Sequence, residues 1–408
     1  MKEFPMSDVP RGVREVTKGL NEAGYRAWIV GGCVRDRLMG RDPSDWDIAT
    51  SATPKQVSRA FRKVLPTGID HGTVTVLHRG EGYEVTTLRG EGAYSDGRRP
   101  DEVFFVDDIR DDLARRDFCV NALAVDVEGA IVDPFGGLED LGARVIRAVG
   151  TPAERFAEDG LRILRGARFV ATLEFELAPE TEAAFRPALP VFAKVSPERV
   201  REEWLKAMKA REPSRAFVVM KRTGILAQTS PALGALSDDD WATNLSILDR
   251  SQATGAERLA GLFRAVSAKQ VEAWLRDYRF SNDERKLILH LLAMDVPHLV
   301  LSGAPLRRWL ANVKTYLAPS LRYVAAVFPD VGEAFSAAAQ EELARKPPLS
   351  TKDLPVGGHD ILPRLNDRPR RLVGDILRTL LDEAIVDPAT AERETLLSRI
   401  DSLIEEAS

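Results

Sequence analysis

Cysteine is almost absent from this chain, because its 408 residues include only Cys33 and Cys119. Two cysteines exclude a disulfide-rich scaffold and give no basis for a cysteine zinc site. Long apolar runs are absent as well, since no stretch approaches the ~20 residues that a membrane span requires. The first residues also lack the apolar segment of a signal peptide. We therefore expect a cytoplasmic protein without a membrane partner.

Histidine is scarce too, with five residues and no H-x-x-x-H spacing that would suit a second metal site. The chain has no G-x-S-x-G elbow and no G-K-[ST] after a glycine-rich turn, which excludes two common catalytic signatures. Positive charge is not in excess, and the net charge of −5 argues against a protein that coats nucleic acid by bulk attraction. Clusters such as Arg115-Arg116 still allow a local basic groove, because phosphate contacts depend on grouped cations.

Length and residue pattern predict one domain that mixes strands and helices, followed by several helical domains. A chain of 408 residues exceeds what one small core supports. Helical and strand patterns alternate over residues 1–150, whereas helical periodicity dominates afterwards, and Pro347-Pro348 marks a further boundary. We predict an α+β fold in which a small mixed sheet with helices at residues 1–150 precedes all-helical parts at 151–215, 216–345 and 346–408.

Helix and strand signals are clearest in the first part. Thr151-Pro152 also opens a helix, since proline suits the first helical position. We expect helices over residues 13–23 and 54–61, and strands at residues 27–30, 45–49, 73–77 and 83–88.

The first candidate site contains the pattern D-W-D at residues 45–47. Alternate side chains of a strand share a face, so Asp45 and Asp47 would point together while Trp46 faces the other side. Two carboxylates at one point suit Mg²⁺, which also takes substrate phosphates. Alone, a D-x-D pair equally fits a solvated edge strand or a turn.

The preceding run G-G-C-V-R-D, at residues 31–36, favours the metal site over those alternatives. Bare backbone at Gly31 and Gly32 would let a triphosphate come close to N–H donors. Together with Arg35, this turn and the D-x-D pair are typical of a metal-dependent nucleotidyl transferase.

Glu84 lies in the strand-like pattern Y-E-V-T-T at residues 83–87. An acid with apolar neighbours is either an exposed position on an edge strand or a third carboxylate facing the metal site. Both interpretations remain open at this point.

A second charged cluster is R-R-D-F-C-V-N, at residues 115–121, beside an apolar segment that we expect to be a strand. Arg116, Asp117 and Asn121 fit a plain charged strand start. They also fit recognition of phosphate or ribose, because arginine offers forked donors to phosphate.

A third cluster is the run E-D-G-L-R-I-L-R-G-A-R, at residues 158–168. Asp159, Arg162, Arg165 and Arg168 stand at steps of three, which would place them on one slowly turning helix face. One interpretation is a salt-bridged surface helix. The other is a polar ladder in which an Asp–Arg pair offers an acceptor and donors to the edge of adenine or cytosine.

Together these motifs resemble the class II tRNA nucleotidyltransferase and bacterial poly(A) polymerase family, in the DNA polymerase beta-like superfamily. The resemblance covers residues 25–210 closely and the rest more loosely. It includes further patterns: H-G-T-V at residues 71–74, Y-S-D-G-R-R-P at 94–100, D-P-F-G-G at 133–137 and S-P-E-R-V-R-E-E at 196–203.

The resemblance implies a polymerase-beta-like head followed by a helical neck, body and tail. It also implies two-metal phosphoryl transfer, in which Asp45 and Asp47 ligate Mg²⁺ while Gly32 and Arg35 hold the triphosphate. Glu84 would be the third carboxylate.

The implied nucleotide site uses the two other clusters. Arg116 would contact the nucleotide, with Asp117 and Asn121 near the ribose. Asp159 and Arg162 would form an amino-acid template that accepts CTP or ATP, and further cations would continue toward the phosphates, namely Arg165 and Arg168.

The expected function is therefore addition of CMP and AMP to the 3′ end of tRNA. Residues 92–100 resemble a flexible loop that CC-adding members lack, which favours full CCA addition or A addition. Residues 357–381 resemble a tail that grips the tRNA elbow. The alternatives are an A-adding enzyme or a poly(A) polymerase. A further alternative is a non-catalytic RNA-binding protein, and the presence of the intact carboxylates Asp45 and Asp47 argues against it.

Overall fold

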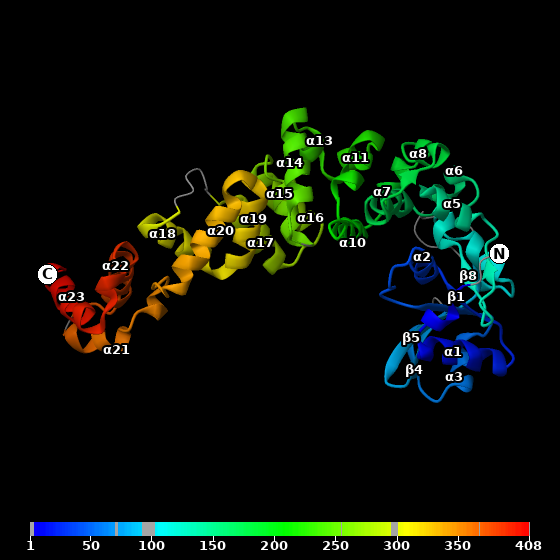
Figure 1. The fold of residues 1–408 in the computed structure, drawn as a ribbon, viewed down its shortest axis with the longest axis horizontal. Helices are drawn as coiled ribbons and strands as arrows, with labels where there is room; N and C mark the ends of the chain where they lie inside the picture. The colour runs from blue at the N-terminus through cyan, green and yellow to red at the C-terminus, as the bar shows by residue number, and fades with distance from the viewer. Residues whose placement is uncertain are drawn as a thin grey trace. The chain divides into compact units, whose positions relative to one another are not determined.

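The computed structural model describes residues 4–69, 72–91, 103–253, 255–294, 301–366 and 368–407. It separates into two units, Met1–Ala235 with Asp277–Arg279 and Leu236–Arg276 with Phe280–Ser408. The predicted α+β fold is confirmed, since a mixed sheet with helices precedes a mostly helical remainder (Figure 1). The division into four parts stays a prediction.

A seven-stranded sheet in the first unit has the order β3-β4-β5-β2-β1-β8-β9. Strands β2 and β5 run parallel, and the other neighbours run antiparallel. The strands are β1 Ala27–Val30, β2 Asp47–Thr50, β3 Val64–Gly68, β4 Thr73–His78, β5 Glu81–Thr87, β8 Ala124–Val125 and β9 Ile131–Val132. The predicted strands are confirmed, although β2 begins two residues later than expected and therefore leaves Asp45 outside it.

Two further pairs of short strands lie outside this sheet. In one, β6 Arg89–Glu91 runs antiparallel to β7 Val103–Phe105. In the other, β10 Val145–Ile146 runs parallel to β11 Glu176–Leu177.

Each face of the large sheet carries its own apolar core. Helices α1 (Arg11–Glu22) and α3 (Pro54–Ala60), both near their predicted positions, pack beside β4 and β5 on one face (Figure 1). Thr53 and Gln56 form a capping box that begins α3, which satisfies its first backbone donors.

The alternation along β2 decides on which face the metal-site carboxylate lies. Ile48 joins the core beneath α1, whereas Ala49 joins the opposite core beneath α4 (Ile109–Ala114). Because strand side chains alternate, Asp47 shares the face of Ala49 and stands at the open end of the sheet.

The three arginines of the predicted ladder lie on one helix, but Asp159 does not. Helix α6 (Pro152–Glu158) ends before Asp159, which has extended backbone, and α7 runs from Leu161 to Leu173. The surface-helix interpretation of this segment is wrong, because ten of the thirteen residues of α7 are buried. Helix α7 packs against α10 (Pro197–Ala207) and α11 (Ser214–Thr223).

The expected strand after Arg116 is also interrupted, because residues 119–121 form a short 3-10 helix, η3, and β8 begins only at Ala124. The remaining helices of the first unit are η1 Met6–Asp8, α2 Gly32–Leu38, η3 Cys119–Asn121, α5 Gly137–Ala143, α8 Pro179–Ala183, α9 Leu189–Phe192, α12 Ile225–Thr229 and α13 Pro231–Gly234.

Helices are the only regular secondary structure that the described residues of the second unit form. Asn244 of this unit is buried and donates to the carbonyl oxygen of Leu262 at 2.8 Å. No described helix combines the length and apolarity that a membrane crossing requires. The α-helices are α14 Asp238–Arg250, α15 Ala256–Leu262, α16 Ala268–Asp277, α17 Asn282–Leu292, α18 Gly303–Val313, α19 Leu317–Val327, α20 Pro329–Ala344, α21 Gly358–Ile361, α22 Leu372–Val386 and α23 Arg393–Glu406.

Four short 3-10 helices connect these elements: η4 Lys314–Tyr316, η5 Thr351–Asp353, η6 Leu362–Arg364 and η7 Pro388–Ala391.

Candidate active site

The turn between β1 and α2 requires glycine at position 31. Gly31 has a φ of +82°, and a Cβ atom there would stand 2.5 Å from Nη1 of Arg116. At Gly32 the nearest atom to an added Cβ is Nη2 of Arg35, at an ordinary 3.6 Å. A side chain at position 31 would therefore collide with the Arg116 guanidinium. Gly32, Arg35 and Arg116 line one cavity, which is described below.

The three carboxylates of the predicted metal site lie together. They line a cavity of about 780 Å³, here called the acidic cavity, whose walls include Asp45, Asp47, Glu81 and Glu84. Pairing of Ile48 with Val85 places Asp47 beside Glu84 on neighbouring parallel strands. Strand β5 lies between β4 and β2, so the interpretation of Glu84 as an edge-strand residue is wrong.

The electrostatics of Asp47 fit a site for a divalent cation. Desolvation by the surrounding protein raises the pKa of its carboxyl, the Arg116 guanidinium lowers it, and the Glu84 and Asp45 carboxylates raise it again, which leaves a raised pKa. A cation placed among these acids would relieve their mutual repulsion. Among the described residues, no group of three or more His, Cys, Asp or Glu could hold a metal ion by itself. A hard cation held by Asp45 and Asp47 would have to complete its coordination with water and substrate phosphates.

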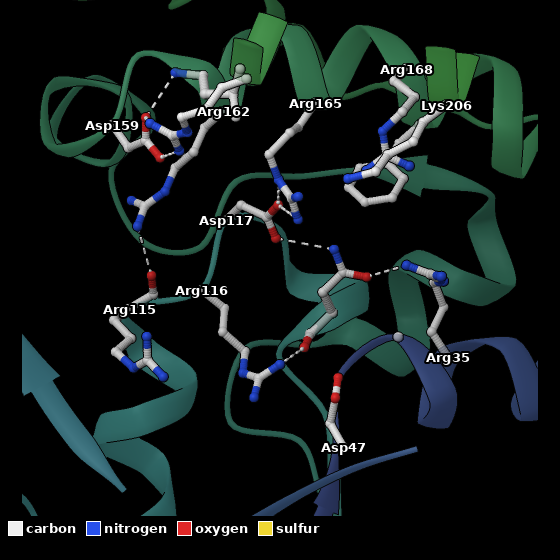
Figure 2. A pocket seen from close by; sticks show the side chains of 15 residues that line it. Arg35, Asp47, Arg115, Arg116, Asp117, Asp159, Arg162, Arg165, Arg168 and Lys206 are labelled. Atoms are coloured by element: carbon white, nitrogen blue, oxygen red, sulfur yellow. Dashed lines mark hydrogen bonds and ion pairs between the residues drawn. The ribbon is translucent and has the colours of Figure 1, made fainter. Parts of the chain in front are cut away.

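A second cavity, of about 550 Å³, shares Asp47 as a lining residue with the acidic cavity. We call it the cationic cavity, because seven arginines and a lysine line it (Figure 2). In Figure 2, Asp47, Arg35 and Arg116 lie at one end, and Asp159, Arg162, Arg165 and Arg168 lie at the other. The cations are Arg35, Arg115, Arg116, Arg162, Arg165, Arg168, Arg199 and Lys206.

Asn121 connects the two arginines of the Asp47 end. Its side-chain oxygen accepts from Nη1 of Arg35, and its backbone oxygen accepts from Nη1 of Arg116 at 3.3 Å. Arg116 also pairs with buried Asp112 at 3.4 Å, while its Nε is buried with no protein partner in the described part of the chain. This buried N–H group of Arg116 could donate a hydrogen bond to an oxygen atom of a bound ligand.

Asp117 is the buried anion that faces Arg165 at the centre of the cavity (Figure 2). Its carboxylate accepts from Nε of Arg165 at 2.7 Å and from the Asn121 amide at 3.0 Å. Burial opposes ionisation of this carboxyl, but the charge of Arg165 and these hydrogen bonds lower its pKa to about 2. Asp117 thus stays ionised and orients two cavity side chains.

The two residues of the predicted base reader are held in different ways. Asp159 accepts from both terminal nitrogens of Arg199, at 3.2 and 2.5 Å. Arg162 donates to the Arg155 carbonyl at 2.8 Å, to the Arg115 carbonyl at 2.9 Å and to the Glu158 carboxylate. Both side chains reach the same cavity from opposite sides of the break between α6 and α7.

Residue patterns did not single out Arg199, Lys206 and Phe169, which line the cavity, or Glu203, which does not line it but pairs with two of its cations. Glu203 is buried and pairs with Arg168 at 2.5 Å and with Lys206 at 3.2 Å. Phe169 lies under the Arg168 guanidinium, 4.0 Å from the ring centroid. The signal that could have found Arg199, Glu203 and Lys206 was their spacing of three to four along one helix, α10.

The structure thus brings together nearly all the predicted site residues, in two adjoining cavities. Asp45 and Glu84 line the acidic one, and Asp47 joins it to the other. Gly31 lines neither cavity, but its lack of a side chain leaves room for the Arg116 guanidinium. The 92–100 loop, His71 and the Y-S-D-G-R-R-P pattern lie outside the described residues.

Comparison with known proteins agrees with this arrangement. Residues 27–147 match the poly A polymerase head domain, and residues 174–236 match the probable RNA and SrmB-binding site of polymerase A. The CCA-adding enzyme of Lactobacillus delbrueckii subsp. bulgaricus is 40% identical over 294 residues, which cover 72% of this chain and 74% of that enzyme. The CCA-adding enzyme of Geobacillus stearothermophilus is 42% identical over 287 residues, which cover 69% and 70%.

This chain belongs to the family of class II CCA-adding enzymes and bacterial poly(A) polymerases. The crystal structure of the Bacillus stearothermophilus CCA-adding enzyme in complex with CTP matches 97% of both chains, with a TM-score of 0.82 and 32% identity. The higher identity of 49% with the Lactobacillus johnsonii CCA-adding enzyme extends over 225 residues, so that match spans only 56% of that relative's length.

Proposed function

We propose that this protein adds CMP and AMP to the 3′ end of tRNA without a nucleic-acid template. The observation that carries the proposal is the position of Asp47 between two cavities of opposite charge. One cavity offers cations for a triphosphate and polar side chains for a base, and the other offers acids where a phosphoryl transfer needs them. The named relatives act as CCA-adding enzymes, which gives the reaction its substrate class.

Asp45 and Asp47 are the proposed ligands of Mg²⁺, with Glu84 as the third carboxylate. When bound there, Mg²⁺ would activate the RNA 3′-hydroxyl and neutralise the phosphates of the incoming nucleotide. The protein's own share is positioning. Arg35 and Arg116 would hold the triphosphate with forked donors, and the buried Asn121 keeps both arginines in place.

Nucleotide choice is assigned to the far end of the cationic cavity. The carboxylate of Asp159 accepts a hydrogen from an exocyclic amino group, and the Arg162 guanidinium donates to a ring nitrogen. Cytosine and adenine carry that amino group, whereas uracil and guanine carry an oxygen at the same place. Asp117 would lie near the ribose, and Arg165 and Arg168 would continue toward the phosphates.

The runner-up functions use the same site. An A-adding enzyme would accept ATP alone, and a poly(A) polymerase would extend unrelated RNA. The identity with CCA-adding enzymes favours CCA addition over both.

The experiment is incubation of three tRNA transcripts with CTP, ATP or both, with a radiolabel on the nucleotide that is followed. One transcript lacks the terminal CCA, the second ends after its second C, and the third is complete. We expect two C residues and one A on the first transcript, one A on the second and none on the third. If C is never added, the protein is an A-adding enzyme, and long A tails on unrelated RNA would identify a poly(A) polymerase.

A further inference from the structure

Phe169 lies in α7, is only 4% exposed and lines the cationic cavity. Three guanidinium groups stand over its ring. Their central carbon atoms lie 4.0 Å from the ring centroid in Arg168, 5.4 Å in Arg35 and 5.5 Å in Arg165. All three distances are within the ~6 Å over which an aromatic face attracts a cation. One ring therefore attracts three of the cations that line the cavity.

These three arginines reach the ring from different parts of the site. Arg165 precedes Phe169 by one turn of α7 and so shares its helix face. Nε of Arg168 donates to the carboxylate of Glu203 in α10 at 2.5 Å. Arg35 belongs to α2 and lies at the end of the cavity that adjoins the acidic cavity, whereas Arg165 and Arg168 lie at the other end (Figure 2). The ring of Phe169 thus links the two ends of the cationic cavity.

One carboxylate serves several of these cations. Glu203 has nitrogen–oxygen distances of 2.5 Å to Arg168, 3.2 Å to Lys206 and 3.9 Å to Arg165. Burial lowers the pKa of the Arg168 guanidinium, and the neighbouring Arg165 lowers it too, so the pKa stays below its usual value although Glu203 raises it. Attraction to an aromatic face is largest for a desolvated cation of this kind.

An aromatic ring differs from a further carboxylate in its effect on an anionic ligand. The face of the ring attracts a guanidinium through the ring quadrupole, yet the ring has no net charge. Phe169 can therefore hold arginines close together while they keep their full charge toward a phosphate, for which arginine offers forked donors. An acid in the same place would neutralise one of these arginines.

We propose that Phe169 is a positioning residue for triphosphate binding, whose ring gathers Arg35, Arg165 and Arg168 without neutralising them. The inference rests on the proposed function, because that function makes a nucleoside triphosphate the ligand of the cationic cavity. Phe169 acts through the three arginines and need not touch the nucleotide. It should therefore govern the affinity for the phosphate groups, and not the choice between bases.

The test places phenylalanine analogues with one, two or three ring fluorine atoms at position 169 of the full chain. Fluorine withdraws electron density from the ring face and so weakens its attraction for cations, while the shape of the side chain changes little. The same analogues at Phe185 are the matched control. Phe185 is fully buried against Phe156, lines neither cavity, and has no cation over its ring within the described part of the chain.

Three quantities are measured in the presence of Mg²⁺. The first two are the dissociation constants of inorganic tripolyphosphate and of CTP without RNA. The third is the CTP-to-UTP ratio of kcat/KM for one nucleotide added to a tRNA transcript without CCA. Tripolyphosphate has no base, so it reports on the phosphate part of the site alone.

We expect both dissociation constants to rise with each fluorine atom at position 169, by roughly tenfold with three, because the arginines lose the attraction that holds them together. The CTP-to-UTP ratio should stay unchanged. Phe169→Leu, which keeps an apolar side chain but has no aromatic face, should weaken binding at least as much. Fluorination of Phe185 should leave all three quantities unchanged.

Dissociation constants that do not change across the fluorinated series would overturn the inference and leave Phe169 a packing residue, even if Phe169→Leu binds more weakly. Absence of tripolyphosphate binding to the unchanged protein would overturn it as well. If Phe169→Leu fails to fold, as judged by thermal melting, the fluorinated series decides the question. Failure of the proposed function looks different, because the unchanged protein would then add no CMP, while tripolyphosphate binding would still test Phe169.

Discussion

The two cavities that meet at Asp47 differ in how their charges are paired. In the cationic cavity, anions hold the cations in place: Asp117 pairs with Arg165, Asp159 with Arg199, and Glu203 with Arg168 and Lys206. In the acidic cavity, no ion pair joins Asp45, Asp47 or Glu84 to a cation within the described residues. The first cavity is thus preorganised by the protein, and the second would be completed by the cation that the proposed function requires.

The difference separates two tasks. Fixed dipoles and charges orient a ligand without moving, so internal pairing suits recognition of a triphosphate and a base. Carboxylates that repel one another suit a site whose charge is completed only when a cation and a substrate arrive. Substitution of a residue of the acidic cavity should therefore affect the rate of nucleotide transfer. Substitution of a residue of the cationic cavity should affect nucleotide selection or the stability of the fold.

The largest effect is expected from Asp45→Ala. Loss of one of the two proposed metal-ligating carboxylates should reduce nucleotide transfer roughly 10³-fold or more, while tRNA binding is largely spared. Asp42→Ala is the control, because Asp42 lies three residues away with 99% of its side chain exposed. Single-turnover kinetics measure nucleotide transfer, and filter binding measures the affinity for tRNA. Retained turnover in Asp45→Ala would show that Asp45 is not a ligand of the catalytic metal.

Glu84→Gln should cost less, roughly 10²-fold in transfer, because the third carboxylate supports a site that two others already form. Glu81→Gln is the comparison, since Glu81 lines the same cavity but accepts from the Tyr83 hydroxyl at 2.6 Å. Equal losses in both variants would mean that only the total negative charge of the cavity matters, and not the position of Glu84 beside Asp47.

Arg162→Ala acts on the cationic side and should change selection more than rate. We expect discrimination against UTP and GTP to fall about tenfold, because the variant lacks one of the two proposed partners of the base. The measurement is misincorporation on a transcript without CCA. Selection that stays as strong as before would argue against the template role of Arg162.

The smallest effect concerns stability and pH. The pKa of Asp117 is lowered to about 2, below its ordinary 3.8, so its ionised form favours the folded state. That contribution is fully present above about pH 4 and is lost as the pH falls toward 2.

The Asp117 contribution should be on the order of 2 kcal/mol in the free energy of unfolding, and Asp117→Asn should remove its pH dependence. Urea unfolding of both proteins between pH 6 and pH 3 provides the comparison. Identical pH slopes for the two proteins would show that Asp117 is not specially stabilised in the folded state.

Much of the fold followed from short-range patterns. The strands at residues 27–30 and 73–77 and the helix start at Thr151-Pro152 appear where alternation and proline placement predicted them. The break at Asp159 did not, because steps of three continue through residues 159–168 as they would on one helix. Close approach of Gly160 to the backbone of Phe192 accompanies the break, since a Cβ atom at Gly160 would stand 2.4 Å from the Phe192 nitrogen. A contact across 32 residues leaves no trace in a local pattern.

By itself, the sequence supplied the residues on which the proposed chemistry rests: a glycine turn, two acids at a spacing of two, and grouped arginines. Those choices are local, since they depend on residue type and on the period of a strand or helix. Only the tertiary structure decided that Glu84 lies beside Asp47 on an interior strand, and that Arg35 and Arg168, from different helices, stand over the ring of Phe169. Both depend on strand order and helix packing, which bring together residues that are distant along the chain.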